Sequence, residues 1–144
     1  MLPTDEGPVH AFKLDTRGLA RVLGDLEAEI MDALWRIDGG RVGDVCSALG
    51  ADANYKTVMT VMNRLVDKRL LRRQRDRRAY VYRPLETREA FLERVSRCVA
   101  EGLLRDFGGV AVAQFVDAVD TVDPALFDQL QALLSARTSG QGPP

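Results

Sequence analysis

The chain has 144 residues, a formal net charge of −1, 46% hydrophobic residues and 28% charged residues. These values are typical of a soluble globular protein with one good core, or with a small domain and an appendage. No run approaches the ~18 consecutive apolar residues of a membrane span, and the first residues lack the pattern of a secretory signal. We therefore expect a cytoplasmic protein that does not associate with a membrane.

The two ends of the chain lack helical or strand periodicity. Residues 1–20 mix Pro, Gly and charges, which predicts a flexible or loosely docked arm. Residues 138–144, TSGQGPP, are expected to be a disordered tail.

Three helices are predicted at the start of a domain that spans residues 21–85. The first opens near Asp25, as a plausible N-cap, and stops at Gly39-Gly40. The second covers RVGDVCSALG and ends at Gly50. The third covers YKTVMTVMNRLVDKRL, where apolar residues recur at helical spacing: Val58, Val61, Met62, Leu65 and Val66.

The periodicity then changes from helix to strand. LLRRQR and AYVYRP are short runs separated by the polar turn Asp76-Arg77-Arg78, and Tyr80 and Tyr82 alternate with Val81. Three helices followed by a hairpin is the order of a winged helix-turn-helix. The predicted fold is therefore mainly α with a small β-hairpin wing.

Residues 86–137 are again helical in pattern, with a break at Gly108-Gly109 and a new helix start at Asp123-Pro124. Short helices cannot bury these apolar stripes on one another alone. We predict a C-terminal helical dimerisation module, so that the chain is its own partner in a homodimer. The alternative is that these helices pack back on the N-terminal domain as part of a monomeric core. The residues expected to form the contact are Phe91, Leu92, Val95, Val99, Val112, Phe115, Val116, Val119, Leu126, Phe127, Leu130 and Leu134.

The small net charge hides a strong asymmetry. From Lys56 to Arg83 there are ten basic residues against Asp67 and Asp76, a local charge of +8 that leaves −9 for the rest of the chain. Such a split indicates a face that binds a polyanion.

The third helix and the hairpin carry the candidate site for double-stranded DNA. The helix face opposite the apolar stripe offers short hydroxyls and basic groups, which suit base edges and phosphates. Its first turn is expected nearest the bases. The arginines at the wing tip are placed to clamp phosphates or to enter a minor groove. The predicted DNA-binding residues are Asn54, Tyr55, Lys56, Thr57, Thr60, Arg64, Lys68, Arg75, Arg77 and Arg78.

Catalysis and metal binding find little support in the sequence. Cys46, Cys98 and His10 are too few and too far apart to supply the four ligands of a structural zinc site. There is no Gly-rich phosphate loop, no nucleophile–base pairing around His10 and no clustered carboxylates. We expect no metal, no cofactor and no catalytic residue, and hence not an enzyme.

Three segments carry a resemblance to a known family. LGDLEAEIMDALW, NYKTVMTVMNRLVDKRLL and AYVYRP resemble the BlaI/MecI/CopY winged-helix repressors over about residues 23–137. The resemblance implies a homodimeric transcriptional repressor on a palindromic operator, with the C-terminal helices as the dimer clasp. It also implies DNA contacts for Lys56, Thr57, Thr60 and Arg64.

The sequence departs from that family pattern at three places. Arg69 stands where a glycine often follows the recognition helix. The Cys-x-Cys pairs of copper-responsive members are missing, so direct copper sensing is not expected. Members cleaved by a sensor protease share an Asn-Phe pair, and the corresponding residues here are Gln114 and Phe115, a candidate protease-sensitive bond.

Two alternatives remain open from the sequence. One is a winged helix used for protein–protein interaction, against which the +8 segment argues. The other is a ligand-responsive regulator with a small-molecule pocket between the domains, although no polar cluster defines such a pocket.

Overall fold

The computed structural model describes residues 11–140, which form two compact units that divide between Val99 and Ala100. Unit 1 contains a short 3-10 helix η1 (Gly18–Arg21), α1 (Asp25–Ile37), α2 (Val42–Leu49), α3 (Tyr55–Asp67), β1 (Leu71–Asp76), β2 (Ala79–Pro84) and the first part of α4 (Arg88–Val122). Unit 2 contains the rest of α4 and α5 (Pro124–Thr138). No helix in residues 11–140 is long and apolar enough to cross a membrane.

The segment before α1 packs on unit 1. Leu19 in η1 and Val22 lie in the hydrophobic core, and the Lys13 N–H donates to the Arg21 carbonyl at 2.7 Å. Part of the arm predicted over residues 1–20, namely residues 1–10, lies outside the described residues, as does 141–144 of the predicted tail. Of the segment predicted as an arm, Leu19 therefore belongs to the core of unit 1, whereas Phe12 and Leu14 are exposed.

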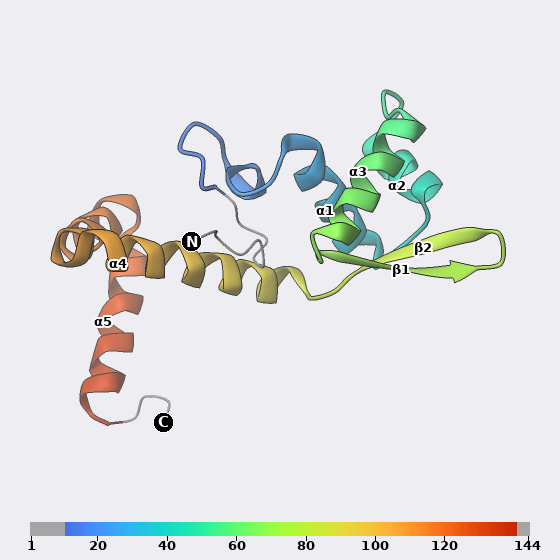
Figure 1. Ribbon diagram of the computed structural model, residues 1–144. Helices are drawn as coiled ribbons and strands as arrows, with labels where there is room; N and C mark the ends of the chain where they lie inside the picture. Colours follow the sequence, from blue (N-terminus) through green and yellow to red (C-terminus); the bar gives the residue numbers. More distant parts are fainter. Residues whose placement is uncertain (1–10, 141–144) are drawn as a thin grey trace. The chain divides into compact units, whose positions relative to one another are not determined.

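The three helices of unit 1 surround one core (Figure 1). Helix α1 begins after Gly24, whose N–H donates to the Glu27 side chain at 2.9 Å, so the N-cap is Gly24 and not Asp25. Ile30 and Leu34 are fully buried on its inner face, and α3 contributes Met62 and Leu65. The 3.6-residue periodicity of the sequence therefore corresponds to the buried faces.

The hairpin extends beyond the helices and is anchored at its base (Figure 1). Its antiparallel register pairs Leu71 with Pro84 and Asp76 with Ala79, which leaves a two-residue turn. At the base, Gly40 and Tyr82 exchange backbone hydrogen bonds of 2.8 and 3.0 Å, so the loop after α1 pairs with β2. This pairing fixes where the wing leaves the domain.

The helices of unit 2 have no buried residue among those described. Gly108 breaks α4 with φ 54° and ψ −129°, as the sequence predicts, and α5 begins at Pro124 with the Asp123 side chain accepting from the Ala125 N–H at 3.0 Å. The buried residues of α4 are Phe91 and Val95, both in unit 1. The part of unit 2 that the structure describes, residues 100–140, therefore has no apolar core of its own.

Candidate nucleic-acid interface

The first turn of α3 presents polar and basic side chains to solvent. Asn54 caps the helix: its Oδ1 accepts from the Thr57 N–H at 3.1 Å and from the Thr57 hydroxyl at 3.3 Å. The Thr60 hydroxyl donates to the Lys56 carbonyl at 2.9 Å. All four residues are exposed because the apolar stripe of α3 is directed into the core. The cap orders this turn, while the Lys56 ammonium and the threonine methyl groups stay accessible.

A buried carboxylate ties α3 to α1. Glu27 is 6% exposed, and its Oε2 lies 2.8 Å from Lys68 Nζ and 3.9 Å from Arg64 Nε. Burial raises the pKa of Glu27, but the hydrogen bonds from Lys68 and Gly24 and the charges of Lys68 and Arg64 outweigh burial and lower that pKa below its ordinary 4.5. Glu27 is therefore ionised and holds two basic residues of α3 in place.

Helix α3 ends in a left-handed residue that carries a charge. Arg69 has φ 63°, its N–H donates to the Val66 carbonyl at 3.0 Å, and the Leu70 N–H donates to the Leu65 carbonyl at 3.0 Å. These two bonds define a Schellman motif, in which glycine is the usual left-handed residue. Arg69 thus occupies a left-handed position at which a residue with a side chain is strained.

The two faces of the hairpin have different surroundings. Alternation in the strands and the register place Arg73 and Arg75 on the same face as their cross-strand partners Tyr82 and Tyr80. That face turns toward α3, because Asn63 Oδ1 accepts from the Tyr82 hydroxyl at 2.8 Å and from an Arg73 NH group at 2.7 Å. The recognition helix and the wing therefore share one hydrogen-bonded junction.

The wing tip concentrates positive charge. Arg77 and Arg78 form the turn and are exposed, and Arg77 has φ 61°. The Arg75 Nε donates to the Arg77 carbonyl at 3.2 Å, and Asp76 pairs with Arg41 at 3.3 Å. Both tip guanidinium groups are thus presented to solvent, as a phosphate-binding wing requires.

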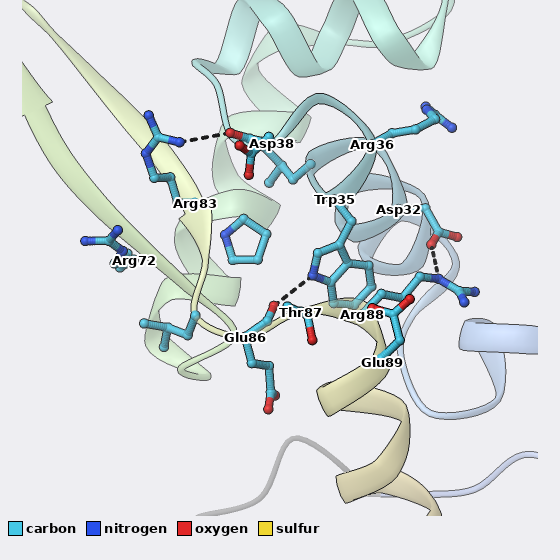
Figure 2. A pocket seen from close by; sticks show the side chains of 13 residues that line it. Asp32, Trp35, Arg36, Asp38, Arg72, Arg83, Glu86, Thr87, Arg88 and Glu89 are labelled. Carbon is cyan, nitrogen blue, oxygen red and sulfur yellow. Dashed lines mark hydrogen bonds and ion pairs between the residues drawn. The ribbon is translucent and has the colours of Figure 1, made fainter.

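A hollow of about 810 Å³ lies on unit 1 between the end of α1, the end of β2 and the start of α4 (Figure 2). Its polar groups largely satisfy one another: Trp35 Nε1 donates to the Glu86 carbonyl at 3.0 Å, and Arg88 pairs with Asp32 at 3.2 Å. Four acidic and four basic residues line it. The residues that line the hollow therefore carry no net formal charge.

The predicted dimerisation residues fall into two groups. Phe91 and Val95 are buried in unit 1 and Val99 packs against its core, so these three pack within that unit, whereas Leu92 of the same unit is 36% exposed. The residues in unit 2 are exposed or half-buried. Strongly exposed apolar residues there are Leu103, Leu104, Phe107, Val110, Val112, Phe115, Val122, Leu126, Leu133 and Leu134.

All the predicted DNA-binding residues lie on α3, its caps or the hairpin, and all except Lys68 are exposed. Lys68 is half-buried because it pairs with Glu27. Sequence reasoning missed Glu27 as an anchor because its pairing with Lys68, 41 positions away, depends on how α1 and α3 pack. It also missed the contact of Asn63 with Arg73, which depends on strand register.

A winged helix whose recognition helix and wing carry exposed basic groups defines a DNA-binding transcriptional regulator. Comparison with known proteins identifies the family of transcriptional regulators to which the chain belongs. The penicillinase repressor family matches residues 23–136, and the chain belongs to that family. Over 124 residues it is 38% identical to the transcriptional regulator BlaI of Mycobacterium tuberculosis, strains H37Rv and CDC 1551, covering 83% of this chain and 88% of the relative. The family consists of transcriptional regulators and not enzymes.

Solved structures with lower similarity include two bacterial proteins. Bordetella bronchiseptica BpsR, described with its regulation of DNA binding by 6-hydroxynicotinic acid, shares 20% identity with a TM-score of 0.44, covering 81% of this chain and 80% of that one. The transcriptional regulator Tm0710 of Thermotoga maritima shares 20% identity with a TM-score of 0.41, covering 73% and 77%.

Proposed function

We propose that this regulator is a repressor that binds a palindromic operator as a homodimer. The observation that carries the proposal is the exposed first turn of α3, on a helix whose C-terminal half contacts, through Asn63, a hairpin that holds six arginines between Leu71 and Pro84. The side chains of the helix and of the hairpin offer two kinds of contact, to base edges and to phosphates. Because the proposed target is bacterial operator DNA, we also propose that the protein acts in the cytoplasm.

The two parts of the interface have different roles in this proposal. Lys56 and Thr57 lie on the first exposed turn of α3 and read bases in the major groove, with Asn54, Tyr55 and Thr60 beside them. The contacts to the DNA backbone come from four exposed arginines, Arg64, Arg75, Arg77 and Arg78. Lys68 acts through Glu27 instead, as a residue that positions α3.

Dimerisation through unit 2 is supported by its exposed apolar surface. Phe115 is 62% exposed and Val110 is 69% exposed, and the described part of unit 2 has no core that could take them up. Contiguous apolar surface of this kind marks an association site. Two copies would give the two-fold symmetry that a palindromic operator requires.

A test separates base reading from backbone contact. Lys56→Ala and Thr57→Ala should each cost about 1–3 kcal/mol at the operator and relax base preference at defined positions. The pair Arg77→Ala and Arg78→Ala should weaken operator and mixed-sequence DNA equally, and should flatten the dependence of log affinity on log salt by about one unit for each lost contact. A wing variant that keeps its salt slope but loses base preference would reverse these roles.

Release of the operator by a sensor protease is proposed at the Gln114–Phe115 bond. Both residues are exposed, but they lie inside α4, so cleavage needs local unwinding of the helix. Mass spectrometry of the fragments from induced cells tests the site. An intact chain in fully induced cells would contradict it.

A further inference from the structure

The junction between α3 and the hairpin contains an arginine whose side chain is held on two sides. An NH group of Arg73 donates to Asn63 Oδ1 at 2.7 Å, and its guanidinium carbon lies 4.6 Å from the centroid of the Tyr80 ring. Arg73 is nevertheless exposed. A guanidinium carries five N–H donors, so one bond to Asn63 leaves most of them available.

Asn63 joins the helix to the wing through one oxygen atom. Its Oδ1 accepts from both Arg73 and the Tyr82 hydroxyl, and Tyr82 is only 2% exposed. An arginine can only donate, so the carboxamide must turn its oxygen, and not its nitrogen, toward this junction. Asn63 therefore sets the position of Arg73 relative to the exposed face of α3.

We propose that Arg73 is a further DNA phosphate contact and that Asn63 is the residue that positions it. The inference deepens the proposed function and rests on it. Holding the guanidinium in place before binding lowers the conformational entropy lost when a phosphate is contacted. The hydrogen bond to Asn63 also fixes the position of the Arg73 guanidinium relative to the residues of α3 that read bases.

The neighbouring residue Arg72 supplies a matched control. It is also an exposed arginine of β1, but it lies on the opposite face, where it is opposite Arg83. Arg73→Gln and Arg72→Gln thus remove the same charge from adjacent positions. We would measure the affinity of each full-length variant over a range of salt concentrations, on a mixed-sequence duplex and on the fragment that the wild type enriches from a random library.

Arg73→Gln should lower the slope of log affinity against log salt by about one unit on both DNAs, and Arg72→Gln should leave it near the wild-type slope. An Arg73→Gln slope equal to that of the wild type, with DNA binding by the wild type intact, would overturn the phosphate contact and leave the proposed function standing. A wild type that binds neither DNA would overturn both.

The role of Asn63 is tested by a double-mutant cycle. Asn63→Ala should weaken binding in the wild type and have no further effect in Arg73→Gln, because the two residues act as one unit. An equal loss in both backgrounds would show that Asn63 does not act through Arg73. If Asn63→Ala leaves the Tyr82 hydroxyl unpaired and lowers the melting temperature, the cycle is repeated with Tyr82→Phe in every protein, which removes that hydroxyl.

Discussion

Glu27 shows how one buried charge can organise a surface that binds DNA. The carboxylate lies under α3 and is paired with Lys68 and, more distantly, with Arg64. Removing one partner of a buried pair costs more than the pair contributes, because the other charge remains desolvated. Lys68 is only partly buried, so part of that cost is offset by water.

We expect Glu27→Gln to lower the free energy of unfolding by about 1–3 kcal/mol, because it leaves the Lys68 ammonium without its carboxylate. Urea denaturation measures the change. Glu29→Gln is the matched control, since Glu29 is exposed on the same helix and should change stability little. Similar values for the two variants would show that the Glu27 ion pair contributes nothing measurable.

The lowered pKa of Glu27 predicts a pH dependence of stability. Because the pKa in the folded state lies below the ordinary 4.5, the stabilisation is fully present above about pH 5 and is lost as the pH falls through the folded-state pKa. The stability difference between wild type and Glu27→Gln should be constant near neutral pH and should shrink below about pH 4.5. A difference that grows as the pH falls would contradict the direction of the shift.

At the scale of single elements, the conformation and the charge of one residue at the end of α3 have opposite effects. Arg69 adopts a left-handed conformation that costs a residue with a side chain roughly 1–2 kcal/mol relative to glycine. The same position is next to the proposed DNA interface, where a positive charge contributes to affinity. Stability and function therefore favour different residues here.

Arg69→Gly should raise the free energy of unfolding by about 1 kcal/mol, and Arg69→Ala should not, because alanine keeps the steric penalty. Both variants lose the same charge, so both should bind DNA more weakly by the same factor. Thermal denaturation and salt-dependent binding are the two measurements. Equal stabilities would mean that the left-handed conformation carries no strain.

Features within a single helix could be predicted from the sequence, whereas contacts between helices could not. Helical periodicity predicts the buried face of α3, which is formed by Val58, Val61, Met62 and Leu65. The backbone preference of glycine predicts the break in α4 at Gly108. The contacts of Glu27 with Lys68 depend on how helices pack. Sequence reasoning could not find them, since the two residues are 41 positions apart.

The same limit applies to the apolar stripe at the start of α4. Phe91 and Leu92 are adjacent in a helix that the sequence predicts correctly, yet Phe91 is fully buried and Leu92 is 36% exposed. Periodicity identifies an apolar face but does not say whether the same chain or a second copy covers it. The ring of Trp35, 5.5 Å from that of Phe91, provides the cover for Phe91 within unit 1.

For the whole molecule, the exposed apolar residues of unit 2 predict self-association. Replacing Phe115 and Val116 together with Asp should convert a dimer into a monomer, because the contact would bury unpaired charges at a cost of several kcal/mol. Sedimentation at micromolar concentration measures the change. Leu14→Asp is the control, since Leu14 is 83% exposed but lies in unit 1. A monomeric wild type at that concentration would contradict the prediction.

The division after Val99 also determines what a break in the second unit would do. The apolar core of the first unit, which includes Phe91 and Val95, is complete before that point, so a chain cut near Phe115 keeps its folded DNA-binding part. In the proposed dimer, the first half-site contact raises the effective concentration of the second DNA-binding part at its own half-site. Cutting the connection removes this avidity without altering a single residue that contacts DNA. Each fragment must then find its half-site independently, and operator occupancy at cellular concentrations falls although the intrinsic affinity of each half is unchanged.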